Sequence, residues 1–177
     1  KAKSKYFLVA NEILTEKGSR GVDVTQSEEF KKSGIIIKTI RLKQSGRSAE
    51  AMSFENINYF DIMNEDDWYE SRLYDIFTGR FLFVVFQENE KNETVLKKAF
   101  FWTMPVQDLA IAEGYWENIR DNVRANKISP DNFYKASNHM KFHVRPKAQN
   151  AADVTQNPHG GTVKKYCYWF NQDYIKE

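Results

Sequence analysis

Apolar and polar positions along the first third of the chain predict one helix followed by two strands. Apolar side chains recur every three to four residues over 6–14, which indicates a helix that ends near Gly18. The apolar run at 34–42 (GIIIKTIRL) is typical of a buried strand. The alternating run at 52–60 (MSFENINYF) predicts a second strand.

The middle of the chain predicts a helix, a hairpin and a second helix. An acidic segment beginning at Asn64 carries apolar residues at helical spacing as far as about Gly79. The runs 80–87 and 95–104 flank a charged turn and are expected to pair as a hairpin. Because both runs are almost entirely apolar, their sheet is expected to be covered on both faces. Residues 106–126 then have the pattern of an amphipathic helix.

The last third predicts two strands joined by a long polar connection. Residues 139–146 alternate and end at Pro146, 147–163 are polar and contain glycine, and 164–170 are apolar again. This order of elements indicates the α+β class (α/β in the broad sense), with a mixed central sheet flanked by helices.

The length of 177 residues predicts one domain with a substantial core. We expect residues 1–28 to form an N-terminal helix and linker, and residues 29–177 to form the domain itself. The chain begins with Lys1 rather than methionine, so a piece of a longer polypeptide is expected.

Composition indicates a cytoplasmic protein that has no membrane partner. No segment approaches the roughly 18 consecutive apolar residues that a membrane span requires. The single cysteine, Cys167, excludes an internal disulfide and lies among aromatic residues, where we expect it to be buried.

Charge is distributed unevenly along the chain although the net charge is only +2. Residues 55–77 contain seven acidic side chains and a single basic one, Arg72. Residues 132–172 contain six basic side chains and a single acidic one, Asp153. A protein with one basic face suits a polyanionic ligand, although surface charge of this kind also occurs without any ligand.

The strand at 34–42 carries a lysine in an unexpected place. Alternation puts Ile36 and Lys38 on the same face. Nucleases that use magnesium build Glu-x-Lys on such a strand, with an aspartate from just upstream, because carboxylates hold the ion that activates water. Here Glu29 is upstream, but Ile36 replaces the glutamate, so we expect a degenerate site without a metal and without turnover. A lysine near a strand end that extends to water is the alternative.

The segment HVRPKAQN (143–150) brings together four side chains that are able to read DNA bases. Arg145 and Lys147 suit the acceptors of guanine, and Gln149 and Asn150 suit the edge of adenine. A polar surface loop is the alternative interpretation. The three histidines do not predict zinc, because His139 and His143 are four apart on a strand and therefore stand roughly 13 Å apart.

The run VRPKAQN (144–150) resembles IRPKAAN of the mismatch-repair endonuclease family MutH. The wider pattern resembles the C-terminal half of GATC-cutting type II restriction enzymes of the Sau-three-A-I type. The similar stretches are Glu29–Thr39, Met52–Phe54, Gly79–Val85, Trp102, Met104, Pro105, His143–Pro146, Trp169, Asn171 and Asp173–Lys176.

The resemblance implies a restriction-endonuclease-like (MutH-like) fold and a division of labour between two halves of one polypeptide. An N-terminal catalytic domain would cut GATC with Mg²⁺, while this domain would bind a second duplex and act as an inactive allosteric effector without a cofactor of its own. By motif, Glu29 and Lys38 match the aspartate and lysine positions of the lost site. Arg145 and Lys147 match residues that read DNA, and Trp169 stands where MutH has a tyrosine near the adenine methyl position.

Two other functions stay open from the sequence. The chain is an active magnesium-dependent endonuclease if another acid, such as Glu28 or Glu55, replaces the missing ligand. It is a dimerisation module if its MutH-like segments no longer bind DNA.

Overall fold

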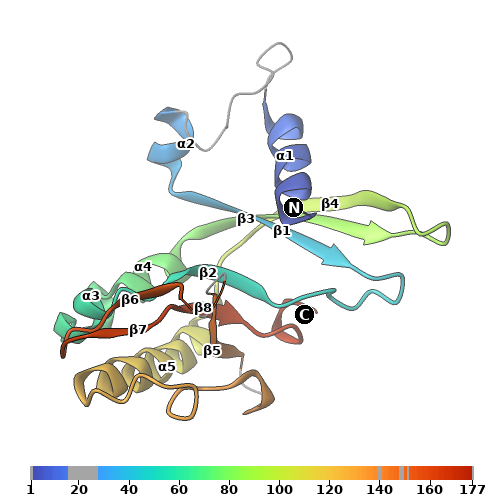
Figure 1. Ribbon diagram of the computed structural model, residues 1–177. Coiled ribbons are helices and arrows are strands. Elements are labelled where there is room, and N and C mark those ends of the chain that lie inside the picture. Colours follow the sequence, from blue (N-terminus) through green and yellow to red (C-terminus); the bar gives the residue numbers. More distant parts are fainter. Residues whose placement is uncertain (1, 16–27, 139–140, 148–149, 151, 177) are drawn as a thin grey trace. The chain divides into compact units, whose positions relative to one another are not determined.

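The computed structural model describes residues 2–15, 28–138, 141–147, 150 and 152–176 (Figure 1). The chain divides into two compact units, each described by itself below. The first unit comprises residues 1–49 and 79–103, and the second comprises residues 50–78 and 104–177. The single domain expected for residues 29–177 stays a prediction.

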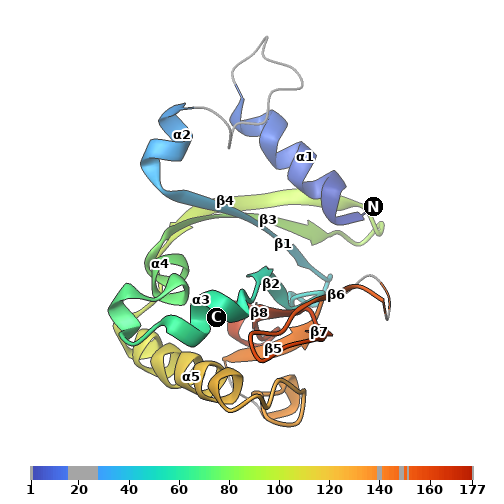
Figure 2. The ribbon, with the colours of Figure 1, turned by 60° about the vertical axis from the view of Figure 1, so that its left-hand side comes forward.

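The first unit is a three-stranded sheet with a helix on one face (Figure 2). The strand order is β1-β3-β4, in which β1 is parallel to β3 and β3 is antiparallel to β4. Its elements are α1 (Ala2–Leu14), α2 (Glu28–Ser33), β1 (Ile35–Leu42), β3 (Arg80–Glu88) and β4 (Thr94–Trp102). The predicted N-terminal helix, the first strand and the hairpin are therefore confirmed.

The two faces of this sheet have different neighbours. Ala10 of α1 packs in a cluster with Leu82, Val84 and Phe86, which fixes this side as the helix-covered face. Ile37 packs against the same cluster, so the alternating residues Ile36 and Lys38 point to the opposite face.

The expectation that the hairpin is covered on both faces holds for β3 and is wrong for β4. β3 is the central strand, and its residues 81–86 are buried. β4 is the edge strand and leaves Val95 46%, Leu96 46% and Phe101 50% exposed. An apolar run does not reveal whether a strand lies at the centre or at the edge of its sheet.

The second unit contains an antiparallel sheet of order β2-β8-β5 and a separate two-stranded hairpin, β6-β7. The strands are β2 (Met52–Asn56), β5 (Phe142–Pro146), β6 (Val154–Gln156), β7 (Thr162–Lys164) and β8 (Tyr166–Phe170). The helices are α3 (Tyr59–Asn64), η2 (Trp68–Glu70), α4 (Arg72–Thr78), α5 (Val106–Arg124), η3 (Ala136–Asn138) and η4 (Tyr174–Lys176).

Aromatic rings fill the core between the β2-β8-β5 sheet and its helices. Phe77 of α4 meets Phe142 and Phe170 at centroid distances of 5.2 and 5.1 Å. Tyr115 of α5 lies against Phe142 and donates its hydroxyl hydrogen to the carbonyl oxygen of His143 at 2.8 Å. Cys167 is buried as expected. These contacts cover one face of the sheet.

Side-chain caps move two of the predicted boundaries. The strand expected at 52–60 stops at Asn56, because the Asn58 side chain accepts hydrogen bonds from the backbone amides of Phe60 and Asp61 and starts α3. The continuous helix expected from Asn64 to Gly79 is wrong, since Asp67 caps η2 separately and α4 begins only at Arg72.

The polar connection expected at 147–163 contains a hairpin instead. Its tip is fixed to the end of α5, where the ring Nε2 of His159 lies 2.8 Å from the carbonyl oxygen of Val123. Asn157 donates to the side chain of Asn126 at 2.9 Å. The hairpin is therefore held by polar side-chain bonds rather than by an apolar run that a sequence pattern would reveal.

The predicted α+β class and a mixed sheet are confirmed, with the strands divided among three sheets. In the part of the chain that the structure describes, no helix combines the length and the apolar character that crossing a membrane would need.

Candidate nucleic-acid interface

Two residues of the expected degenerate site, Ile36 and Lys38, lie on an aromatic face of the first unit. Lys38 is paired in register with Phe83, and Ile36 is paired with Phe81. Phe83 in turn meets Phe100 and Trp102 of β4 at centroid distances of 5.7 and 5.4 Å. The surroundings of Ile36 and Lys38 on this face are thus carbon-rich. Glu29 belongs to α2, and its side chain lies outside the described residues.

These residues do not fit a magnesium ion. Mg²⁺ prefers several oxygen ligands, and Ile36 offers none from its side chain. Among the described residues no group of three or more histidine, cysteine, aspartate or glutamate side chains is placed to hold a metal. The aromatic partners of this face supply no further carboxylate.

The two carboxylates named as substitutes for the missing ligand, Glu28 and Glu55, take part in ion pairs. Glu55 accepts from both the Nε and the NH2 group of Arg72, each at 2.9 Å, in a two-point pair. Glu28 lies 4.0 Å from Lys32 on the next turn of α2. Glu55 also lines a pocket of about 180 Å³ with Asp61, whose carboxylate accepts from Asn58 at 2.6 Å.

The basic segment has a different geometry, because β5 and β8 bring Arg145 onto Trp169. His143 and Trp169 are directly opposite in the antiparallel register, and Arg145 follows two residues later on the same face. The central carbon of the Arg145 guanidinium lies 3.9 Å from the centroid of the Trp169 ring. This distance is that of a cation stacked on an aromatic face.

A second ring lies parallel to Trp169. The imidazole of His143 is 6.0 Å from the indole, centroid to centroid, at an interplanar angle of 17°. His143 is 1% exposed and Trp169 is 4% exposed, whereas Arg145 is exposed. Burial, with a smaller effect from the charge of Arg145, lowers the pKa of His143 to about 4. The histidine is therefore neutral near pH 7.

Lys147 directly follows β5 and forms hydrogen bonds with two neighbouring backbone carbonyl groups. Its ammonium group donates to the carbonyl oxygen of Phe54 at 2.9 Å, and its backbone amide donates to the carbonyl oxygen of Lys165 at 3.2 Å. The thiol of Cys167 donates to the same Phe54 oxygen at 3.0 Å. The bond to Phe54 holds the Lys147 ammonium group in place. Because an ammonium group has three donors, others remain for another acceptor.

Of the other two predicted DNA-binding residues, the structure describes Asn150 but not Gln149. Gln149 lies outside the described residues. Asn150 is exposed, and its side-chain oxygen accepts from the backbone amide of Ala152 at 2.9 Å, which forms a turn before β6. The structure thus brings Arg145 and Trp169 into contact, with Lys147 on the same strand exit and Asn150 in the following turn.

Comparison with known proteins identifies the family. The family model described as "MutH: DNA mismatch repair enzyme MutH" matches residues 21–113, more than half of the chain. The chain belongs to the MutH family. The matched region contains Ile36 and Lys38 and ends before Arg145.

A similar protein extends the likeness across the rest of the chain. The type II restriction enzyme Sau3AI of Staphylococcus aureus is 25% identical over 220 aligned residues, which cover 97% of this chain and 44% of the relative. This MutH-family chain therefore spans less than half the length of the curated relative that it matches.

The sequence did not reveal that His143 lies against Trp169. The sequence suggested His143 only as a candidate zinc ligand, whereas in the structure its ring lies nearly parallel to that of Trp169, 6.0 Å away. The signal that could have revealed it is the pairing of β5 with β8, because His143 and Trp169 lie far apart in the sequence.

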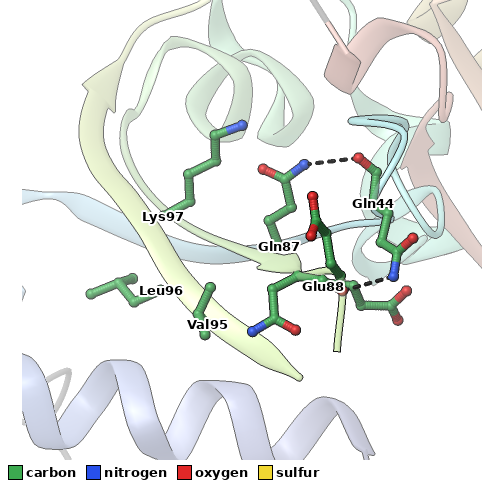
Figure 3. A pocket seen from close by; sticks show the side chains of 8 residues that line it. Gln44, Gln87, Glu88, Val95, Leu96 and Lys97 are labelled. Carbon is green, nitrogen blue, oxygen red and sulfur yellow. Dashed lines mark hydrogen bonds between the residues drawn. The ribbon is translucent and has the colours of Figure 1, made fainter. Parts of the chain in front are cut away.

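The first unit of this MutH-family chain also contains a shallow pocket. It has a volume of about 460 Å³, and its lining includes Gln44, Gln87, Glu88, Leu96 and Lys97 (Figure 3). The Gln87 amide donates to the backbone oxygen of Gln44 at 3.3 Å. None of the predicted site residues lines it.

Proposed function

We propose that this chain binds double-stranded DNA sequence-specifically without cutting it, as the effector domain of a type II restriction endonuclease. GATC is the proposed recognition sequence, and the cytoplasm is the compartment expected for this role. Membership of the MutH family supports a role connected with DNA, because the family model carries the name of a DNA repair enzyme.

The observation that carries the proposal is the face of β1. Hydrolysis of a phosphodiester with magnesium needs oxygen ligands, yet Ile36 and its register partner Phe81 offer carbon. Lys38 alone cannot activate water. We infer that a chain with this fold and without the ligand at Ile36 keeps DNA binding as its activity.

Binding is supported by the exposed cations at the end of β5. None of the ion pairs between described residues involves Arg145, so its guanidinium donors stay available. Lys147 adds a second cation two residues later. Arginine and lysine are the side chains that bond the guanine acceptors in the major groove.

The proposed partner within a longer polypeptide is an N-terminal catalytic domain. Sau3AI is a type II restriction enzyme more than twice as long as the aligned region of this chain. We propose that in such a polypeptide the other half contains the magnesium-dependent site and that occupation of this domain by DNA activates it.

Gel shifts with two duplexes test the proposed binding. The 177-residue chain is titrated against a GATC duplex and a scrambled duplex of the same composition at several salt concentrations. GATC binding should be tighter by a margin on the order of a thousandfold, and both affinities should fall as salt rises. Equal affinities for the two duplexes would contradict sequence-specific recognition.

A dimerisation module is the second candidate, favoured by the exposed apolar residues of the edge strand β4. Val95, Leu96 and Phe101 are each about half exposed there. Sedimentation velocity over a range of chain concentrations tests it. A stable dimer without any affinity for duplex DNA would favour this function over the first.

A further inference from the structure

We propose that Trp169 is a positioning residue that holds the Arg145 guanidinium flat for base reading, with His143 as its support. In this assignment the indole is a platform, and the arginine is the group presented to DNA. The inference rests on the proposed DNA-binding function and adds to it how recognition would be oriented.

The register of two strands builds the platform. His143 of β5 and Trp169 of β8 are directly paired, and their rings are within 17° of parallel. Arg145, two residues further along β5, returns its guanidinium to 3.9 Å above the same indole. Three side chains from two neighbouring strands therefore meet, with the indole in contact with the guanidinium and nearly parallel to the imidazole.

The indole is enclosed by its neighbours. The guanidinium lies 3.9 Å from its centroid, the imidazole lies 6.0 Å away and nearly parallel to it, and Trp169 is only 4% exposed. A base therefore finds little exposed indole surface on which to stack. The guanidinium, by contrast, keeps its donors at its edge, in the plane that bidentate recognition of guanine uses.

His143 suits the supporting position because it stays uncharged. Both of its ring nitrogens are buried and have no hydrogen-bond partner among the described residues. A charged imidazole at this position would repel the guanidinium of Arg145. The lowered pKa of His143 agrees with this arrangement, which the ring geometry establishes on its own.

A second arginine in the same unit also stacks on a tryptophan, but its charge is paired within the fold. Arg120 of α5 lies 4.3 Å above Trp116, but its Nε donates to the carboxylate of Asp121 at 2.9 Å. The charge of Arg120 is thereby neutralised within the fold. Arg145 is stacked in the same way, yet no ion pair between described residues includes it. Arg120 is therefore the matched control.

The test is a double-mutant cycle on DNA preference. Affinities for the GATC and scrambled duplexes are measured by fluorescence anisotropy for the wild type, Trp169→Leu, Arg145→Ala and the double variant. Trp169→Leu should reduce the GATC preference about tenfold, as expected for loss of a stacked cation, with little change in scrambled binding. In the Arg145→Ala background the same change should have no further effect. Trp169→Phe, which keeps a ring, should retain most of the preference, and Arg120→Ala should retain all of it.

Two results would overturn the inference while leaving the proposed function intact. One is a preference for GATC that Trp169→Leu does not change. The other is an effect of Trp169→Leu that is equally large with and without Arg145, which would make the indole itself the contact.

The contact between Arg145 and Trp169 can also be tested in the free chain. This measurement decides the inference even if the chain has no GATC preference or Trp169→Leu fails to fold. In the wild type, the ring current of Trp169 should shift the NMR signals of the Arg145 side-chain protons upfield. The shift should shrink in Trp169→Phe, and Arg120 provides the reference. Unshifted Arg145 signals in the wild type would refute the platform. Wild-type chain with shifted signals and no DNA preference would refute the proposed function alone.

Discussion

At the scale of single residues, the proposed function depends on two positions, Ile36 and Arg145. Ile36 stands beside aromatic rings where hydrolysis needs oxygen ligands. Arg145 is exposed and stacked, with its donors at the surface. We therefore expect DNA binding, for which Arg145 has exposed donors, and no hydrolysis, for which Ile36 offers no metal ligand.

Arg145 and Lys147 are expected to differ in what they contribute to DNA binding. Arg145→Ala should cost about 1–3 kcal/mol of GATC binding and relax the preference between sequences, because a base contact is lost. Lys147→Ala should weaken binding of both duplexes to a similar degree, because we expect its ammonium group, already bonded to the Phe54 carbonyl oxygen, to contact phosphate rather than a base. Anisotropy titrations with GATC and scrambled duplexes measure both. An equal loss on the two duplexes for Arg145→Ala would exclude base reading by this residue.

His143 is expected to make stability depend on pH in acid. Above pH 6.5 the ring is neutral in both the folded and the unfolded chain, so it has no effect. Between 6.5 and about 4 the unfolded chain binds a proton that the folded chain excludes, so the free energy of unfolding falls as pH falls. The full loss is on the order of 3 kcal/mol.

Urea denaturation of the wild type and of His143→Phe at pH 7, 6, 5 and 4.5 measures this effect. The difference between the two proteins isolates His143, because the other titrating groups are common to both. Parallel pH profiles would show that the ring is protonated equally in both states.

The individual candidate site residues could be predicted from their spacing in the sequence. The contacts that they make with one another in the folded chain could not. Glu-x-Lys spacing identified Ile36 and Lys38, and the cluster of base-reading types identified Arg145 and Lys147. The stack with His143 depends on the pairing of β5 with β8, and strand register is set by contacts remote in sequence. Trp169 was expected at the interface, and its burial under Arg145 appears only in three dimensions.

At the scale of elements, polar side-chain bonds decide where several helices and strands begin and end. Apolar runs identified β1, β3 and β8, because most side chains of β3 and β8 are buried and those of β1 are at least partly buried. The hairpin β6-β7 was missed because its three-residue strands are polar and are fixed by His159 and Asn157. Local caps such as Asn58 overrode the alternating pattern that predicted a longer strand.

The attachment of the β6-β7 hairpin is expected to depend on His159. His159→Ala removes the contact with the Val123 carbonyl and should speed hydrogen exchange of the hairpin amides, because local opening becomes easier. Global stability should change by no more than about 1 kcal/mol. Exchange measured by NMR tests this, with the exposed Gln156→Ala as control. Unchanged exchange would mean that the histidine does not hold the hairpin.

The first turn of α5 is expected to be tied to the C-terminal segment through Asp108. This buried carboxylate accepts from Lys141 at 2.6 Å and from the Tyr174 hydroxyl at 2.7 Å. Asp108→Ala should lower the free energy of unfolding by about 2 kcal/mol, because two partly buried donors lose their acceptor.

Urea denaturation compares Asp108→Ala with Asp131→Ala. Asp131 forms an exposed pair with Lys135, so its removal should leave stability unchanged within error. A loss of similar size in both variants would contradict a specific role for the buried carboxylate.

At the scale of the whole molecule, fold class and family follow from the sequence, while the grouping of strands does not. The order of helices and strands correctly predicted an α+β protein with a mixed sheet, and the MutH-like motifs agree with the family match. The described residues form three sheets within two compact units, and periodicity carries no information about which strands share a sheet.

The most direct measurement of the central claim is incubation of excess chain with an end-labelled GATC duplex in magnesium. One sample is read twice, by anisotropy for binding and on a denaturing gel for strand integrity. We expect the duplex to be bound while both strands stay intact, because Ile36 supplies no metal ligand. Cleaved strands that disappear when the magnesium is chelated would contradict the account.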